Sequence, residues 1–304
     1  MSKILGVCEL RKALPRLGFG LLLDRVEVFG REKLTAAKAM TVNEEFFNGH
    51  FPEHPIMPGV LQVEMMKQLA ELSARPELAS SAEDDIYIAK LERVKFRRPV
   101  TPGDRLRVEA ELVEEDAASR RYRTKVRIGA DTASEAFITL KSRRIEPPTE
   151  LPPETSEFDK TAESPLDTAA MKKLMPHRYP FLFIDYIAKR EGDKVVAIKN
   201  VSANDSFFRF APENAAVPEA LLCEMGAQAG CACVLSRPEN AGKLGFFMAI
   251  DSAESIAPVI PGDQLAIGIE LPPAKARFGK GSCEIRVNGE VRFRISLMFA
   301  IVDA

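Results

Sequence analysis

The feature that most constrains this chain is an internal duplication, because its two halves carry matching segments in the same order. LPRLGFGLLLDRV at 14–26 matches MPHRYPFLFIDYI at 175–187. PIMPGVLQVEMMKQLA at 55–70 matches AAVPEALLCEMGAQAG in the second half, and RPVTPGD at 98–104 matches APVIPGD at 257–263. The offset between the copies changes only from 161 to 159 residues. This pattern indicates that one structural unit was duplicated and that the two copies pack against each other.

The two copies are separated by a stretch that is typical of a linker. Residues 146–167, EPPTELPPETSEFDKTAESPLD, are rich in Pro, Glu, Ser and Thr and lack periodic apolar positions. We therefore expect one domain over 1–145 and a second over 168–304. A length of 304 residues, 46% of them hydrophobic and 28% charged, suits two globular domains.

Each half is predicted to contain one buried helix and several antiparallel strands. Helices are expected from about Pro58 to Ala74 and from Pro218 to Ser236, and both are apolar on all sides. Apolar and polar residues alternate along 105–112 and 265–271, which indicates strands. Asn288-Gly289 between alternating runs predicts a tight hairpin. The predicted class is α+β, with an antiparallel sheet wrapped around a central helix in each half.

Composition excludes several classes of function. A formal net charge of −2 gives no general attraction to nucleic acid. No apolar run reaches the roughly 20 residues that a membrane-spanning helix needs. The five cysteines form no C-x-x-C pair, so Cys231 and Cys233 are expected to be small buried side chains and not metal ligands. We expect a cytoplasmic protein.

Only three histidines can serve as a base near neutral pH: His50, His54 and His177. His50 lies in FFNGHFPEHPIMPGV, where glycines and prolines fix the backbone just before the first helix. Such a loop suits a catalytic base, although a structural hydrogen bond would also explain a loop histidine. His54 is expected to be a solvated loop residue.

Both predicted helices carry a carboxylate on an apolar surface. Glu64 and Gln68 are four residues apart, and Glu224 and Gln228 repeat this spacing. Burial raises the pKa of a carboxyl group, which suits a proton donor, but a carboxylate held by backbone amides would fit the same pattern. Gly59 begins the first helix, where free amides can polarise a carbonyl group, or it can simply ease entry into the helix.

The run FFNGHFPEHPIMPGVLQVEMMKQLA strongly resembles the 3-hydroxyacyl-acyl-carrier-protein dehydratases of the FabZ type, and so do KFRRPVTPGD at 95–104 and LMPHRYPFLFID at 174–185. The resemblance implies hotdog domains that pair, here as an intramolecular pseudo-dimer, with the active site at their interface. It implies that a histidine removes the C2 proton of a 3-hydroxyacyl thioester, an acid assists loss of the C3 hydroxyl, and a glycine amide holds the carbonyl. It also implies that neither a metal nor an organic cofactor takes part. It also implies that four further residues line the substrate cavity: Phe51, Pro58, Val60 and Gln228.

Applied to both halves, the resemblance predicts one working site and one degenerate site. The working site would combine His50 and Gly59 with Glu224. The degenerate site would contain Glu64, but Phe210 or Ala211 stands in place of the histidine, and Glu219 replaces the glycine. A carboxylate at that position would repel a developing oxyanion. His177 is expected to be structural or to flank the substrate.

A cluster of basic residues occurs in the first half only. Its members are Lys90, Arg93, Lys95, Arg97 and Arg98, and the matching stretch 250–258 has none. Acyl carrier proteins are acidic, so this cluster is predicted to guide docking of the carrier, although an ordinary charged strand face would look the same. By analogy with the family, three copies of the chain could form a homo-oligomer.

Three other functions remain open at the level of sequence. A hotdog thioesterase, or a dehydratase acting on coenzyme A thioesters, would share the fold. A non-catalytic protein that binds acyl thioesters or partners an enzyme would not need His50. Isomerisation of the new double bond is a further alternative, although glutamate in place of aspartate as the acid favours plain dehydration.

Overall fold

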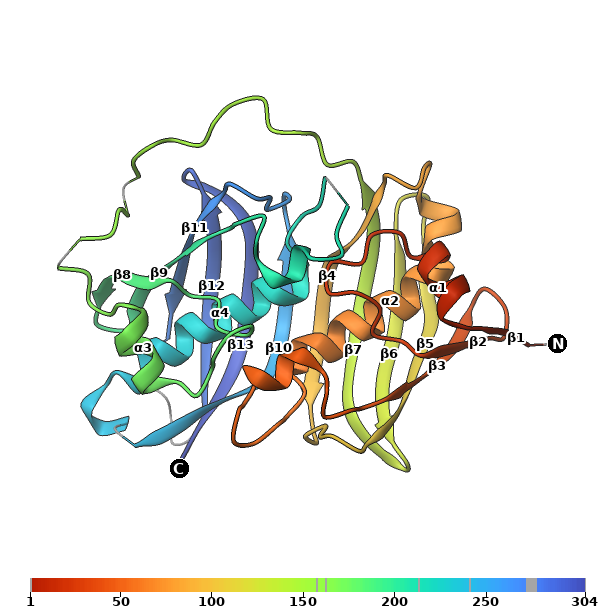
Figure 1. Ribbon diagram of the computed structural model, residues 1–304, viewed down its shortest axis with the longest axis horizontal. Coiled ribbons are helices and arrows are strands. Elements are labelled where there is room, and N and C mark those ends of the chain that lie inside the picture. Colours follow the sequence, from red (N-terminus) through yellow and green to blue (C-terminus); the bar gives the residue numbers. More distant parts are fainter. Residues whose placement is uncertain are drawn as a thin grey trace.

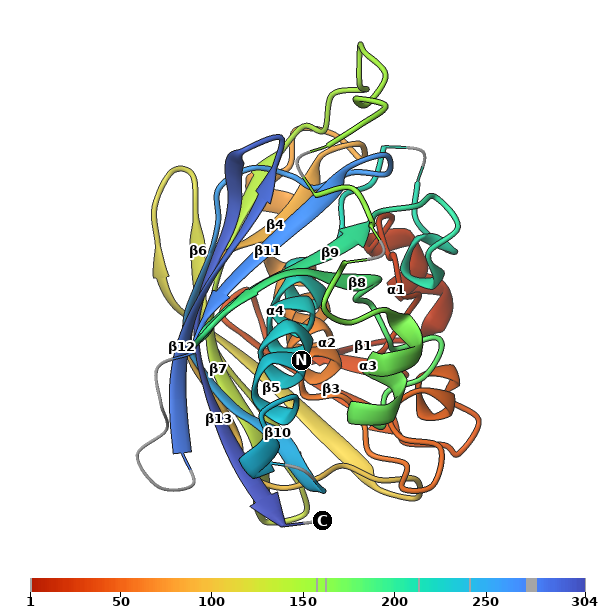
Figure 2. The same cartoon turned by 90° about the vertical axis from the view of Figure 1, so that its left-hand side faces the viewer.

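The computed structural model describes residues 2–156, 158–161, 163–212, 214–240, 242–271 and 278–303. In this part of the chain a continuous antiparallel sheet of 13 strands curves around two long helices (Figures 1 and 2). The first half contains β1 (Lys3–Leu5), α1 (Val7–Ala13), β2 (Arg25–Val28), β3 (Lys33–Ala39), η1 (Glu45–Asn48), α2 (Gly59–Leu78), β4 (Asp85–Phe96), β5 (Arg105–Glu115), β6 (Arg120–Ile128) and β7 (Asp131–Arg143).

The second half repeats most of these elements. They are α3 (Thr168–Leu174), β8 (Tyr186–Glu191), β9 (Lys194–Asn200), η2 (Ser206–Phe208), α4 (Glu219–Leu235), η3 (Pro238–Asn240), β10 (Lys243–Ser255), β11 (Gln264–Glu270), β12 (Phe278–Val287) and β13 (Glu290–Asp303). The strand order confirms the duplication. From the centre outward it is β4-β7-β6-β5-β3-β2 on one side and β10-β13-β12-β11-β9-β8 on the other, with β1 added at the edge beside β2.

The two halves join where β4 pairs with β10. Val94 lies opposite Ile250 and Leu91 lies opposite Ala253, and all four side chains are buried. The pairing therefore combines backbone hydrogen bonds with apolar packing, as an obligate subunit interface does. The structure confirms the predicted α+β class and the intramolecular pair of hotdog units.

The helices α2 and α4 lie on the concave face of the sheet and contact each other, close to their predicted bounds (Figure 2). Helix α2 extends four residues beyond the predicted Ala74, to Leu78. Both are buried over most of their surface because the sheet covers one side and the loops and short helices cover the other. The predicted hairpin is confirmed, with positive φ at Asn288 and Gly289 between β12 and β13.

The stretch between β7 and α3 runs along the outside of the molecule and, where described, contains no helix or named strand (Figure 1). Leu151 within it is 93% exposed, and at its end Leu166 forms an isolated bridge with Ile187. None of the helices in the described residues is both long enough and apolar enough to cross a bilayer.

Cutting this connection should leave the two halves associated, because the β4–β10 pairing and its buried side chains do not depend on it. A protease site placed next to Leu151 provides the cut. After cleavage, both fragments should elute together in size-exclusion chromatography and separate only in denaturant. Separate elution of the two fragments after cleavage, in the absence of denaturant, would contradict this interpretation of the interface.

Candidate active site

His50 is held in a tight loop between η1 and α2. Its backbone N–H donates to the Phe46 carbonyl at 2.9 Å, and its own carbonyl accepts from the Ile56 N–H at 3.1 Å. Its ring Nδ1 lies 2.8 Å from the Ile56 carbonyl oxygen. A carbonyl can only accept, so Nδ1 carries the proton and Nε2 keeps its lone pair. The loop therefore presents His50 as a base through Nε2.

The loop of His50 meets the start of the second half at Gly49. A side chain there would place its Cβ 2.3 Å from the Arg178 carbonyl oxygen and 2.8 Å from the Phe181 nitrogen. The Arg178 N–H also donates to the Gly49 carbonyl at 3.0 Å. Only glycine permits this approach, and the contact brings the segment that carries His177 against the loop of His50.

Glu224 projects from the buried helix α4 and is only 6% exposed. Gln228, one turn later, donates to Glu224 Oε1 at 2.9 Å and to the Phe181 carbonyl at 2.9 Å, and it accepts from the Phe183 N–H at 3.0 Å. His177 Nε2 lies 3.5 Å from the same Glu224 oxygen. Gln228 thus ties the carboxylate to the loop that holds His177.

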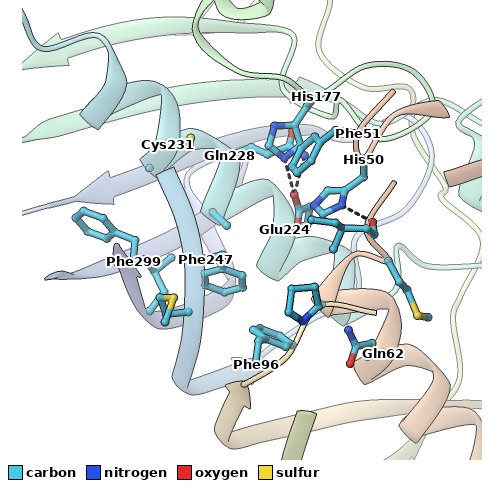
Figure 3. A pocket seen from close by; sticks show the side chains of 18 of the residues that line it. His50, Phe51, Gln62, Phe96, His177, Glu224, Gln228, Cys231, Phe247 and Phe299 are labelled. Carbon is cyan, nitrogen blue, oxygen red and sulfur yellow. Dashed lines mark hydrogen bonds and ion pairs between the residues drawn. The ribbon is translucent and has the colours of Figure 1, made fainter. Parts of the chain in front are cut away.

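These groups line one cavity of about 290 Å³, which is formed by both halves (Figure 3). His50, His177 and Glu224 gather in one part of it, and the two histidine rings have centroids 5.5 Å apart. The part toward β10 and β13 is apolar and is lined by Cys231, Val234, Phe247, Met248, Leu297 and Phe299. The cavity therefore offers a polar centre together with space for an alkyl chain.

Burial is the main cause that lowers the pKa of His50 to about 4, against the opposing charge of Glu224. His50 is therefore neutral near pH 7. Burial by itself would raise the pKa of Glu224, but the hydrogen bonds and electrostatic influence of the groups around it, His177 foremost, outweigh burial and lower that pKa below its usual value. The expectation that burial leaves this carboxyl with a raised pKa is thus wrong for Glu224, because its polar partners favour the charged form.

Gly59 also lines the cavity, at the N-terminus of the 20-residue helix α2. A Cβ there would come within 2.6 Å of the Phe96 ring. The first amides of a helix lack intrahelical acceptors and carry partial positive charge, so this position can stabilise a negative oxygen. Phe51 and Gln228 line the cavity as expected.

Two expected lining residues, Pro58 and Val60, do not line the cavity. Val60 is buried in the hydrophobic core, and Pro58 caps the helix with its carbonyl, which accepts from the Leu61 N–H at 3.1 Å. Successive residues of a helix point about 100° apart, so Gly59 and Gln62 face the cavity in this turn and Val60 does not.

The equivalent region around Glu64 is closed, with a remaining cavity of only about 30 Å³. Ala211 lines it, Phe210 packs over Gly20, and Arg16 stands where the second half has His177. Glu219 accepts from the Ile88 N–H at 3.2 Å and pairs with Arg143 at 2.8 Å. The first residue of α2 is a glycine with free helix amides, whereas the first residue of α4 is Glu219, which forms a buried ion pair with Arg143.

On the side of this closed region, helix α2 carries charged side chains that form ion pairs. Lys67 Nζ lies 2.6 Å from Glu71 Oε2, and Arg75 Nη2 lies 2.7 Å from Glu71 Oε1. The matching positions of α4 are Ala227, Cys231 and Leu235. Burial, only partly offset by the charge of Lys67, raises the pKa of Glu64 to about 7. Sequence reasoning missed this network, although charges four residues apart on an otherwise apolar helix could have revealed it.

The predicted basic cluster is exposed but is not compact. Arg97 and Arg98 line the cavity, with side chains 48% and 41% exposed, and pair with Glu135 and Asp131. Lys95 and Arg93 follow along β4, whereas Lys90 lies five residues beyond Lys95, at roughly 3.3 Å per residue. In the described residues no group of His, Cys, Asp and Glu side chains is placed to hold a metal ion.

Two paired hotdog units with a histidine and a glutamate in an interface cavity define a double-hotdog protein with an acid–base site. A family model described as the FabA-like domain matches the chain twice, at residues 18–134 and 175–296. The chain therefore belongs to the FabA-like family and contains two copies of its domain.

Each repeat corresponds in length to a whole relative. The 3-hydroxyacyl-acyl-carrier-protein dehydratase FabZ of Geobacillus thermodenitrificans is 44% identical over 140 residues, which cover 45% of this chain and 97% of that protein. The FabZ of Bacillus thuringiensis is 42% identical over 140 residues, with the same coverage.

Solved structures share the double fold. The dehydratase domain from the CurJ module of the curacin polyketide synthase has a TM-score of 0.61 at 13% identity and covers 94% of this chain and 97% of its own. A protein described as an oleoyl thioesterase from Lactobacillus plantarum has a TM-score of 0.57 at 8% identity, with coverage of 90% and 97%. At such identities the likeness shows the fold alone, and the fold serves more than one reaction.

Replacing Lys67 with methionine should destabilise the protein without changing the turnover of the folded enzyme. The change leaves Glu64 and Glu71 with less positive charge around them, and removing one partner of a buried ion pair costs about 3–5 kcal/mol. Chemical denaturation measures the change in the free energy of unfolding. The control Lys33→Met, at an exposed position, should change it by less than about 0.5 kcal/mol. Similar stability of the two variants would show that the network contributes nothing.

Proposed function

We propose that this chain removes water from 3-hydroxyacyl thioesters carried by acyl carrier protein, giving trans-2-enoyl thioesters, at one active site per chain. The observation that carries the proposal is the cavity that His50 and Gly59 of the first half share with Glu224 of the second. Membership of the FabA-like family and the names of the FabZ relatives support the same reaction. The setting would be cytoplasmic synthesis of fatty acids or related lipids.

In the proposed reaction His50 acts twice. Neutral Nε2 takes the C2 proton, and the electron pair of that C–H bond forms the C2=C3 double bond as the C3–O bond breaks. The helix N-terminus at Gly59 stabilises the negative charge that develops on the thioester oxygen. The low pKa of His50 makes its imidazolium a ready donor, so it returns the proton to the departing hydroxyl, which leaves as water.

Ionised Glu224 has a supporting part in this scheme. It accepts a hydrogen bond from the C3 hydroxyl and stabilises the positive charge that forms transiently on His50. This differs from the proton donor implied by the family resemblance, and it follows from the polar partners of the carboxylate. The apolar part of the cavity, along β10 and β13, would hold the acyl chain.

The partner would be an acidic acyl carrier protein that docks beside Arg97 and Arg98, where exposed basic side chains meet the cavity. Arg93 and Lys95 extend this surface along β4, and Lys90 would contact the carrier less because it lies farther away. Assembly of three copies into one particle stays a prediction by analogy.

Product analysis decides between dehydratase and thioesterase. The protein is incubated with 3-hydroxyacyl thioesters of several chain lengths, on carrier protein and on coenzyme A, and enoyl thioester is separated from free acid. We expect 2-enoyl product, formed faster from the carrier-bound substrate. Release of free acid would favour the thioesterase, and no conversion would favour a binding protein.

His50→Ala and Glu224→Gln should each lower kcat by at least about 100-fold, because they remove the base and the charge that supports it. Glu64→Gln should leave kcat within about twofold, since Glu64 lies in the closed region. Steady-state kinetics on each variant, with matched thermal unfolding, gives the comparison. Equal loss from the Glu64 change would contradict the model of a single site.

The activity should persist well into the acidic range. His50 must be neutral to accept the C2 proton, and its pKa of about 4 keeps it neutral down to about that pH. We therefore expect kcat/KM to stay flat from pH 7 to about pH 5 and to fall as the pH passes through about 4. A midpoint near 6.5, the value of an ordinary histidine, would show that burial does not lower the pKa of His50.

A further inference from the structure

The two halves offer an internal comparison around the carboxylates of α2 and α4. The segment before β8 places His177 beside Glu224 in the open cavity. Its counterpart before β2 has Arg16 in the closed region, where Arg16 donates to the Asn214 carbonyl. A histidine therefore occurs at this position only in the copy that faces the open cavity, which suggests that its imidazole serves the reaction.

The segment of His177 is held firmly against the site. Arg178 donates to the carbonyls of Met175 and His177 at 2.8 and 2.7 Å and to that of Lys172 at 3.0 Å. The His177 ring lies edge-on to the Phe51 ring, with centroids 5.0 Å apart. These contacts orient Nε2 toward Glu224, as Figure 3 shows.

Packing alone does not explain an imidazole at this position. His177 is 8% exposed, and its Nδ1 is buried without a hydrogen-bond partner in the described part of the chain. An unpaired buried nitrogen costs free energy that a phenyl ring of similar size would avoid. The contact that distinguishes the two rings is the one from Nε2 to Glu224.

We propose that His177 is a positioning residue for the dehydration: it donates through Nε2 to Glu224 and fixes the orientation and the charge of that carboxylate. The inference rests on the proposed function and assigns no proton transfer to His177. Its Nε2–Glu224 distance of 3.5 Å is long for a hydrogen bond, and such contacts commonly shorten when substrate closes the site.

The charged and polar groups around Glu224 determine in which direction its pKa changes when His177 is removed. The titratable groups that influence it are His50, His177 and the thiols of Cys223 and Cys231, and Arg97 and Arg98 line the same cavity. Burial pushes the pKa of Glu224 up, and His177 contributes the largest opposing influence. Without His177, the pKa of this carboxyl rises, because burial is then opposed only by the remaining polar neighbours.

The experiment compares three replacements of His177 in the whole enzyme. Phenylalanine fills the space but donates no hydrogen bond. Glutamine places an amide N–H near the position of Nε2, whereas asparagine places it near Nδ1. His54→Phe, in an exposed loop outside the cavity, is the matched control. Thermal unfolding checks each fold, and kcat and KM for a 3-hydroxyacyl carrier-protein thioester are measured from pH 4 to 9.

We expect His177→Phe and His177→Asn to lose kcat toward acidic pH and to regain it as the pH rises. The loss is roughly tenfold for each unit by which the pKa of Glu224 exceeds the assay pH. The acidic limb of the kcat profile therefore moves to higher pH. His177→Gln should keep the limb near its wild-type position, and His54→Phe should change nothing.

Other outcomes overturn the inference. If the phenylalanine and asparagine variants lose activity equally at every pH, or if glutamine restores nothing, His177 does not act through the charge of Glu224. If the phenylalanine variant does not fold, the difference between the pH profiles of kcat for His177→Asn and His177→Gln tests the inference. Absence of enoyl product from the wild-type enzyme would instead refute the proposed function.

Discussion

The pairing of β4 with β10 is the contact on which the rest of the structure depends. An unpaired sheet edge is a liability in water, and this pairing covers one edge of each repeat while it sets α2 beside α4. It also brings the loop of His50 to the helix that carries Glu224, so that one cavity is lined by both halves. Neither repeat contains the full set of polar groups by itself.

Duplication within one chain allowed the two equivalent regions to diverge. In the open cavity, α4 contributes small or thiol side chains at Ala227 and Cys231, which leave room for an alkyl chain. In the closed region the matching positions of α2 are Lys67 and Glu71, whose ion pair occupies that space. Buried ion pairs add little net stability over apolar packing, yet each charge needs its partner.

Burial affects the two key groups of the open cavity in opposite ways. It lowers the pKa of His50, so the imidazole is a neutral base at rest and a strong donor once protonated. It would raise the pKa of Glu224, but hydrogen bonds from the side chains around that carboxylate prevail. The protein thus keeps His50 neutral and its neighbour Glu224 charged, because burial outweighs the polar partners of His50 but not those of Glu224.

The sequence by itself determined the duplication, the two buried helices, the Asn288-Gly289 hairpin and the asymmetry of His50, Gly59 and Glu224, because periodicity and repeated motifs are local properties of a chain. Tertiary structure decided which side chains surround the cavity. Phe247 and Phe299 are 52 residues apart in sequence and lie opposite each other where β10 pairs with β13. Pro58 and Val60 do not line the cavity, and the pKa of Glu224 depends on His177, 47 residues earlier. Packing between segments that are distant in sequence sets the distances between side chains and the extent to which they are desolvated, and the sequence alone does not reveal either.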